Sequence, residues 1–316
     1  MRDEFEIDPE MKPSLARMKE RMESRPPMTS VEPAEMRQRA REEFAAMNQN
    51  PPELALVRDT FVEGAFGPCK IRIYDAVGER KQAPGLIYFH GGGWIVGDLD
   101  TEDVKLRHLA LASKVRIVSV DYVLAPDHRF PDPVDDCVAA ARSIYANASK
   151  LGMNPQKLAI GGASAGANLA LSTAISLRDT KQTWLRFMLL FYGVFDMTST
   201  SASRTLFSEG FGMGADAMEL FYSLYVAKKE DRTLPMASPL LADLGELPPA
   251  FINGAGLDVL RDDSRQLATK INKAGGQAHL HEVPGVIHGY TLLTHEVSAA
   301  RDAIELAGQA LYSALR

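Results

Sequence analysis

Cysteine is almost absent from the sequence, with only Cys69 and Cys137 among 316 residues. Two thiols cannot form a disulfide framework, and no metal-ligand spacing surrounds them, so we expect two reduced, partly buried side chains. A stripe of Lys and Arg is also lacking, and the formal net charge is −6. Nucleic-acid binding needs clustered positive charge to neutralise phosphates, so a nucleic-acid partner is disfavoured.

Long hydrophobic runs are missing as well. No apolar stretch reaches the roughly 20 residues that a membrane-spanning helix needs. The segment from Met1 to Glu6 is acidic and has none of the apolar character of a secretory signal, so we expect a cytoplasmic protein. Hydrophobic residues make up 46% and charged residues 24% of the chain, which is typical of a globular enzyme and not of a disordered chain.

Residues 1–50 contain no strand-like run and are rich in Met, Glu and Arg. Pro26 and Pro27 divide the region into two expected helices, and Pro51 and Pro52 end it. Each expected helix carries one apolar stripe at helical spacing, so we expect both to pack against another part of the protein. The two stripes are Leu15, Met18 and Met22, and Met36, Ala40, Phe44 and Met47.

From about residue 55, short apolar runs alternate with helical stretches. The first two runs predict an antiparallel pair, and the near-continuous apolar runs after them predict parallel strands covered on both faces. Alternating strands and helices indicate an α/β fold with a doubly wound, mostly parallel sheet of eight strands and helices on both faces. The expected strands are 57–63, 70–75, 85–89, 116–120, 157–160, 187–192, 250–253 and 279–283, and clear helical stretches are 103–113, 133–148 and 168–177.

One stretch interrupts this alternation, because no strand-like run occurs between Phe195 and about Leu234. A long insertion of this kind is often a lid or cap beside a site, although its Phe and Met residues would also suit an extra core helix. We therefore predict an α/β core of residues 51–195 and 234–316. A helical cap would consist of the N-terminal segment 1–50 and the insertion 196–233.

Ser164 lies in the turn Gly162-Ala163-Ser164-Ala165-Gly166, between an apolar strand and the helical stretch 168–177. A tight strand-to-helix turn forces strained backbone angles on its serine and leaves no room for bulky neighbours. It projects the hydroxyl above the sheet near a helix N-terminus, which favours developing negative charge. A Gly-rich helix-capping turn is the alternative, since short motifs need context. The context favours Ser164 as a nucleophile.

A second motif, His90-Gly91-Gly92-Gly93-Trp94, directly follows an expected strand. Three consecutive glycines are entropically costly, but their backbone N–H groups can approach an oxyanion closely. We assign Gly92 and Gly93 as oxyanion donors, with Ala165 as the third. A flexible turn or a phosphate-binding loop are the alternatives, but the phosphate-loop patterns are absent. His90 is interpreted as structural.

The general base is predicted to be His288, in the loop after the last expected strand. Catalytic residues of α/β sheets come from the carboxyl ends of strands, and His288 occupies that position among the seven histidines. A histidine with only local hydrogen bonds is the alternative.

The orienting acid is predicted to be Asp258, which follows the strand 250–253 and the turn 254–257. The chain order Ser164, Asp258, His288 is then the order of a nucleophile-elbow hydrolase. Asp196 also follows a strand and is the rival. Asp262 and Asp263, beside Arg261, are interpreted as a solvated helix start.

Taken together, these motifs resemble those of the hormone-sensitive-lipase-like esterases. The motifs of the glycine loop and of the Ser164 turn are joined by Asp121-Tyr122-Val123-Leu124-Ala125-Pro126-Asp127, by Gly256-Leu257-Asp258-Val259-Leu260-Arg261-Asp262 and by His288-Gly289. The resemblance implies an α/β-hydrolase fold with a helical cap, no cofactor and often a homodimer. The chain departs from the family in Ala163, where Asp or Thr is usual, and in Val259, where Pro is usual.

The expected function is that of a carboxylesterase, which hydrolyses short-to-medium acyl esters of small molecules through a Ser-His-Asp covalent mechanism. An amide hydrolase of the same fold, such as an arylformamidase, would use the same residues and stays open. A ligand receptor on this fold is a weaker alternative, because such receptors lose the catalytic histidine and His288 is present.

Overall fold

The computed structural model describes residues 5–27 and 30–316. Eight strands of these residues form one sheet in the order β1-β2-β4-β3-β5-β6-β7-β8. β2 pairs antiparallel with both β1 and β4, whereas all neighbours from β4 to β8 are parallel, which confirms the predicted mostly parallel sheet. The strands are β1 (Leu56–Gly64), β2 (Gly67–Asp75), β3 (Ala83–Phe89), β4 (Arg116–Val120), β5 (Met153–Ala163), β6 (Leu185–Phe191), β7 (Ala250–Leu257) and β8 (Ala278–Ile287).

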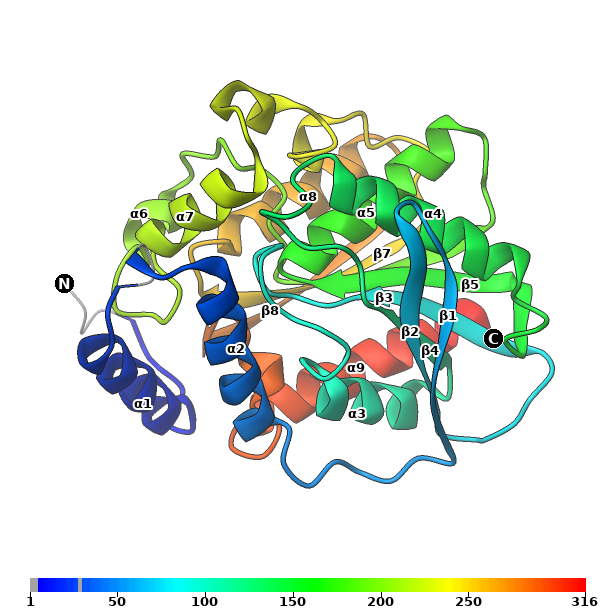
Figure 1. Ribbon diagram of the computed structural model, residues 1–316, viewed down its shortest axis with the longest axis horizontal. Coiled ribbons are helices and arrows are strands. Elements are labelled where there is room, and N and C mark those ends of the chain that lie inside the picture. Colours follow the sequence, from blue (N-terminus) through cyan, green and yellow to red (C-terminus); the bar gives the residue numbers. More distant parts are fainter. Residues whose placement is uncertain (1–4, 28–29) are drawn as a thin grey trace.

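Helices cover both faces of the sheet (Figure 1). On one face α3 (Asp103–Ser113) packs against α9 (Ser298–Leu315), and on the other lie α4 (Asp132–Ala146), α5 (Ala165–Asp179) and α8 (Arg261–Lys273). Every residue of β4 and β7 is buried, because these strands have helices above and below. This double cover explains why the strands read as continuous apolar runs in the sequence. Short 3₁₀ helices span Lys229–Thr233, Pro239–Leu241 and Tyr290–Leu292.

The strands that lead into the site are longer than predicted. β7 continues through the expected turn 254–257, and β8 continues through the expected loop to Ile287, so both turn predictions were wrong. β7 and β8 pair with each other along this stretch, and glycine in a strand does not prevent such pairing. The register shifts between Ala255 and Leu257. A Cβ at Gly256 would lie 2.9 Å from the Val283 carbonyl oxygen, so glycine is required here by close approach.

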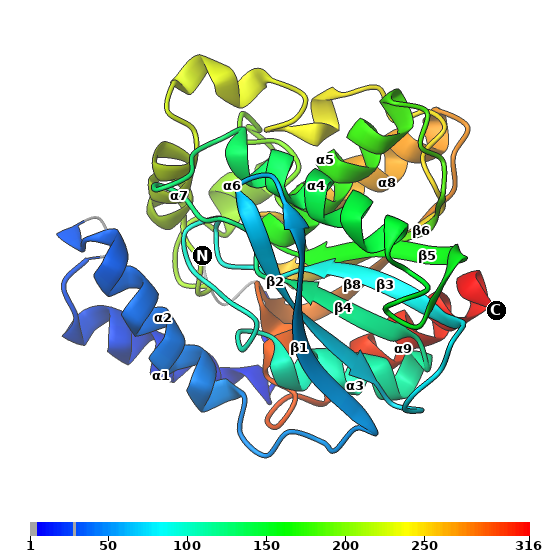
Figure 2. The ribbon, with the colours of Figure 1, turned by 45° about the vertical axis from the view of Figure 1, so that its right-hand side comes forward.

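The segments expected to form a cap contain α1 (Met11–Ser24), α2 (Pro33–Met47), α6 (Ala202–Leu206) and α7 (Ala215–Tyr225). Both views place these four helices on the same side of the molecule, with α1 and α2 standing out from the body (Figures 1 and 2). Residues 1–4 and 28–29 of the predicted N-terminal cap segment lie outside the described residues.

The α1 segment is fastened to the last part of the chain. Asp8 N donates to Gly285 O at 2.9 Å, and the Ser14 hydroxyl donates to Glu296 Oε2 at 2.6 Å. The Ser298 hydroxyl donates to Glu10 Oε2, also at 2.6 Å. These bonds place α1 beside the end of β8 and the segment that leads into α9.

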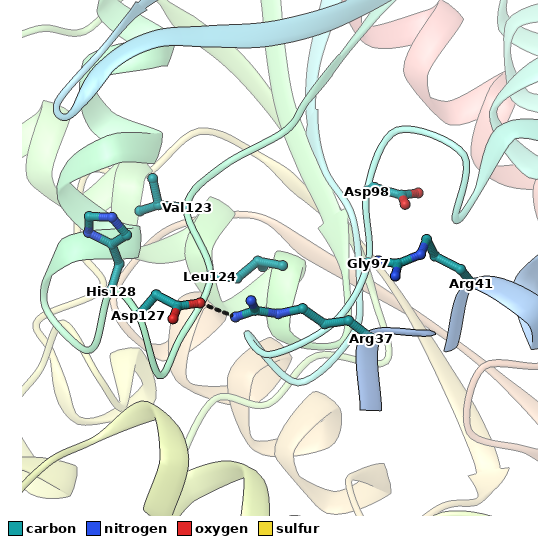
Figure 3. Close-up of a pocket in the computed structure, with 8 residues that line it drawn as sticks. All are labelled: Arg37, Arg41, Gly97, Asp98, Val123, Leu124, Asp127 and His128. Carbon is teal, nitrogen blue, oxygen red and sulfur yellow. Dashed lines mark ion pairs between the residues drawn. The ribbon is translucent and has the colours of Figure 1, made fainter. Parts of the chain in front are cut away.

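Arg37 attaches α2 to two loops of the core (Figure 3). Its Nε donates to Ile95 O at 3.0 Å and its Nη2 donates to Ala125 O at 2.9 Å, while the guanidinium also pairs with Asp127 at 2.6 Å. A cavity of 270 Å³ borders these residues, but none of Ser164, Asp258 and His288 lines it. Arg37 therefore has a fastening role, since it fixes the loop after the three glycines to the N-terminal helices.

Candidate active site

Ser164 occupies the turn between β5 and α5, with the backbone angles φ 54° and ψ −119°. Such a positive φ is strained for any residue with a Cβ, and the surroundings hold it in place. Ser164 N donates to Phe191 O on β6 at 2.9 Å. A Cβ at Gly166 would lie 2.1 Å from Phe89 O, so glycine there lets the elbow sit directly on β3. The turn leaves Ser164 9% exposed at the end of the sheet.

The structure brings the three predicted triad side chains into one hydrogen-bonded chain. His288 Nε2 lies 2.9 Å from Ser164 Oγ, and His288 Nδ1 lies 2.7 Å from Asp258 Oδ2. Because an ionised carboxylate only accepts, Nδ1 carries the proton and Nε2 is left to accept from the serine hydroxyl. The side chain of Asp258 is fully buried, and its other oxygen accepts the Leu260 N–H at 2.9 Å.

Asp196, the rival acid, is not part of this arrangement. Its Oδ1 accepts from the backbone N–H of Thr198 at 2.8 Å and from the Thr198 hydroxyl at 2.7 Å, which closes a local turn. Asp196 lies five residues after the end of β6, and the carboxylate is used in this local turn.

The three glycines after β3 run alongside the elbow. A Cβ at Gly91 would lie 3.6 Å from Ser164 Cβ. Gly92 and Gly93 have φ values of 125° and 60°, which only glycine adopts without strain, and within the described chain their N–H groups donate to no protein acceptor. Ala165 is the first residue of α5, so its N–H has no partner within the helix. The oxyanion role of Gly92, Gly93 and Ala165 stays a prediction, as do the triad roles.

His90 contacts the glycine loop and Tyr122, and no hydrogen bond joins it to Ser164 within the described residues. It is buried and stacks on Tyr122, with ring centroids 4.4 Å apart. Its Nδ1–H donates to Gly91 O at 2.7 Å, while the Tyr122 hydroxyl donates to His90 O at 2.8 Å. This arrangement fits the structural role that the sequence suggested for His90, and it shows Tyr122 bound to the same peptide.

Tyr192, directly after β6, is a neighbour of the site that the sequence analysis missed. Its ring meets the His288 ring edge to face at 5.0 Å, and its hydroxyl forms a short hydrogen bond with Thr291. Its φ of 35° is unusual for a non-glycine residue. The only signal in the sequence was its place at the carboxyl end of a strand.

Phe221 on α7 packs directly on the glycine loop. A Cβ at Gly93 would lie 2.7 to 2.8 Å from atoms of the Phe221 ring, so the ring rests against the bare backbone of that glycine. The loop before α7 also reaches the site, because a Cβ at Gly212 would lie 3.2 Å from Ile287, the residue before His288. The segment 196–233 therefore borders both the glycine loop and Ile287, the residue before His288.

Asp263 corrects one interpretation of the sequence, because it is fully buried and not part of a solvated helix start. It accepts the backbone N–H groups of Phe195 and Asp196 at 2.9 and 3.1 Å, and it pairs with Arg204 of α6 at 3.0 Å. Burial raises the pKa of Asp263 to about 6, although Arg204 and both N–H groups act in the opposite direction. Asp263 therefore holds α6 and the segment that follows β6 against the start of α8.

The described residues contain no cluster of three or more His, Cys, Asp or Glu side chains that could hold a metal ion. They also contain no helix with the length and apolar character needed to cross a membrane. Cys69 and Cys137 are free and buried, as expected.

Comparison with known sequences agrees with the geometry. Residues 86–292 match a family described as having the alpha/beta hydrolase fold. Carboxylesterase NlhH of Mycobacterium tuberculosis is 37% identical over 259 residues, which cover 80% of each chain. Esterase LipI of the same organism is 33% identical over 258 residues and covers the same shares.

Solved structures are similar over almost the whole length. The ester-hydrolase EH1AB1 from the metagenome of Lake Arreo, in complex with a bipyridine phosphonate derivative, is 36% identical with a TM-score of 0.93, covering 97% of this chain and 98% of its own. A hyperthermophilic esterase of Pyrobaculum calidifontis is 32% identical with a TM-score of 0.93, covering 98% and 99%. The chain therefore belongs to the α/β-hydrolase-fold family, among the hormone-sensitive-lipase-like esterases whose motifs it carries.

Proposed function

We propose that this protein is a carboxylesterase that hydrolyses short-to-medium acyl esters through a covalent acyl-enzyme formed on Ser164. The observation that carries the proposal is the continuous hydrogen-bonded chain from Ser164 through His288 to Asp258, with contacts of 2.9 and 2.7 Å. Nucleophile, base and orienting acid are within hydrogen-bond reach of each other, which is the requirement for activating a serine hydroxyl.

The proposed reaction has two displacement steps. His288 Nε2 takes the proton of the Ser164 hydroxyl while Oγ forms a bond to the ester carbonyl carbon, and the carbonyl electron pair becomes an oxyanion. The N–H groups of Gly92, Gly93 and Ala165 stabilise that oxyanion. His288 then protonates the departing alcohol. Water, activated by the same histidine, releases the acid and restores the serine.

We also propose that residues 1–50 and 196–233 form a cap over a core of residues 51–195 and 234–316. Support comes from Phe221 against Gly93, from Gly212 beside Ile287, and from the bonds of Arg37 to Ile95 and Ala125. Phe221 and Ile287 bring apolar side chains to the glycine loop and to the residue before His288, which favours an uncharged acyl or alcohol group of modest size.

Replacing Ser164 with Ala tests the function. The variant should lose at least about 1,000-fold in kcat on p-nitrophenyl butyrate, because the residual rate over water comes from binding and the oxyanion donors alone. Its thermal midpoint should stay close to that of the parent protein, since only one hydroxyl is removed. Turnover within tenfold of the parent would contradict the assignment.

The substrate class needs a second measurement. Rates on p-nitrophenyl esters from acetate to dodecanoate, set beside rates on N-formyl amides, separate an esterase from an amide hydrolase of the same fold. A higher kcat/KM on the amides would overturn the ester proposal while leaving the triad in place. The homodimer and the cytoplasmic location stay predictions, and light scattering and cell fractionation test them.

A further inference from the structure

Two charged side chains lie buried beneath the glycine loop, and the proposed reaction does not use them. Glu102 precedes α3 and Lys105 lies in its first turn, with side chains 3% and 0% exposed. Lys105 Nζ and Glu102 Oε2 are 2.7 Å apart. Apolar side chains of similar size usually stabilise a fold as well as a buried ion pair does. Stability alone therefore gives no reason for charges at these positions.

The carboxylate of Glu102 divides its two oxygens between the loop and the ion pair. Oε1 accepts the backbone N–H of Gly91 at 2.7 Å. Oε2 accepts from the Tyr88 hydroxyl and from Lys105, both at 2.7 Å. Each oxygen is thus occupied, and the position of the carboxylate is fixed by the end of β3 and the start of α3.

The peptide unit between His90 and Gly91 is held at both ends as a result. Its N–H is bound by Glu102, and its carbonyl oxygen accepts the Tyr122 hydroxyl at 2.8 Å. This peptide comes immediately before Gly92 and Gly93. Glycine has the largest backbone freedom of any residue, so three in a row keep one geometry only if neighbouring groups impose it.

Lys105 also contacts the groups that support the nucleophile and the base. Its Nζ lies 4.1 Å from the centroid of the Phe191 ring and 5.6 Å from that of Tyr192. Phe191 O is the acceptor for Ser164 N, and the Tyr192 ring meets His288 edge to face. Lys105 therefore contacts one residue that holds Ser164 and one that packs on His288.

The carboxyl group of Glu102 is held in its charged form. Burial acts against ionisation, but the facing Lys105 ammonium and the hydrogen bonds from Lys105, Gly91 and Tyr88 outweigh it, so the Glu102 pKa lies below its usual value. A charged acceptor forms a stronger and shorter bond to a backbone N–H than a neutral one.

We propose that Glu102, held in place by Lys105, is a positioning residue that orients the backbone of Gly91, Gly92 and Gly93 for binding the oxyanion. The inference rests on the proposed esterase function, since it concerns the same site. An oxyanion donor acts only from a hydrogen-bond distance of about 3 Å, and a misplacement of about 1 Å lowers rates by up to about 100-fold.

Two double variants separate positioning from packing. E102L/K105M and E102Q/K105M both remove the buried charges together, which avoids leaving one charge unpaired. They differ only at residue 102, where Gln keeps an oxygen to accept the Gly91 N–H and Leu does not. Urea unfolding and circular dichroism establish that both are folded before kinetics are compared.

The Leu variant should lose about 10- to 100-fold in kcat on p-nitrophenyl butyrate with KM within threefold of the parent. The Gln variant should keep kcat within about threefold. A trifluoromethyl ketone, to which the Ser164 hydroxyl adds to give a bound oxyanion, should bind more weakly to the Leu variant by the same factor as its loss in kcat/KM.

Equal kcat values for the two double variants, whether high or low, would overturn the proposal, as would a loss confined to KM. If E102L/K105M does not fold, E102D decides the same point, because it keeps the charge but withdraws the carboxylate by one methylene. We then expect kcat at least about fivefold lower at unchanged KM, and an unchanged kcat overturns the proposal.

Failure of this proposal differs visibly from failure of the esterase assignment. If Ser164→Ala removes the activity and E102L/K105M does not alter it, only the positioning role is wrong. If Ser164→Ala keeps the activity, the nucleophile itself is wrong, and the positioning role with it.

Discussion

Two fully buried ion pairs lie at opposite ends of the same strands. Glu102 and Lys105 are beneath the glycine loop at the carboxyl end of β3, whereas Asp75 and Arg116 are near the start of β4, with side chains 0% exposed and 2.9 Å apart. Burying either pair costs desolvation free energy, which the other contacts of the pair must offset. Those contacts differ in kind.

Arg116 forms hydrogen bonds mainly to the backbone of turns. Its Nη1 donates to Leu151 O at 2.7 Å and its Nη2 donates to Gly78 O at 2.9 Å, while Arg80 also pairs with Asp75. A planar guanidinium suits several fixed acceptors at once. Lys105 instead rests on aromatic rings and holds a carboxylate toward Gly91. The comparison indicates that one pair ties turns together and the other sets the geometry of a site.

The largest effect on stability should follow from Arg116→Met. Removing one partner leaves the buried Asp75 with Arg80 and the backbone N–H groups of Val77 and Gly78, so we expect a loss on the order of 3 kcal/mol in the free energy of unfolding, measured in urea. The kcat of the folded variant should equal that of the parent protein. A fall in kcat of more than threefold would show that this pair also influences the site. The proposed difference in role between the Asp75–Arg116 pair and the Glu102–Lys105 pair would then be wrong.

Removing a single hydroxyl near the glycine loop should have a smaller effect on stability and a measurable effect on kcat. Tyr122→Phe removes the bond to His90 O, so the free energy of unfolding should fall by about 1 kcal/mol and kcat by about threefold to tenfold. Tyr74→Phe is the matched control, because its buried hydroxyl donates to Asp103 at 2.9 Å and to Leu99 O at 3.4 Å, and neither acceptor belongs to the His90–Gly91 peptide. It should lose the same stability and keep its kcat. Equal kcat values for the two variants would contradict a role for the His90–Gly91 peptide.

The smallest effect is expected at a partly exposed pair, Asp59 with Arg72. The hydrogen bond from Arg72 lowers the pKa of Asp59 to about 2, against the opposing effect of burial, and Lys70 adds to the lowering. The ionised carboxylate therefore stabilises the folded state above its ordinary pKa of 3.8, and this contribution disappears as pH falls toward 2.

Asp59→Asn should lower the free energy of unfolding by less than about 1 kcal/mol at pH 7, because solvent screens the pair. Urea titrations of parent and variant at several pH values measure the difference, which should shrink between about pH 4 and pH 2. A difference that stays constant over that range would contradict the assignment.

The sequence predicted the sheet well where strands are buried on both faces. Runs such as 117–120 and 187–191 are largely apolar because helices cover both sides, so their pattern is visible without the fold. The ends of β7 and β8 were misjudged, since glycine reads as a turn although a neighbouring strand pairs with it. Because the apolar pattern of the buried strands locates them in the sequence, it also predicts that Ser164, Asp258 and His288 follow strand ends.

Residues whose roles depend on distant partners could not be predicted. Glu102 lies among acidic residues, and its partner Gly91 stands 11 residues earlier at the other end of the same connection between β3 and α3. Asp263 also looked solvated, yet it meets Arg204, 59 residues earlier in the chain. A local pattern contains no information about such encounters, because burial of a charge depends on the whole tertiary structure.

The fastening of α1 also sets an order of events during synthesis. Asp8, Glu10 and Ser14 bind Gly285, Ser298 and Glu296, and the last two pairs are 288 and 282 residues apart along the chain. His288 lies between these late partners. Because synthesis runs from the N-terminus to the C-terminus, α1 can complete these contacts only after the segment that contains His288 has been made. A docked α1 therefore marks a chain in which all three proposed triad residues are already present.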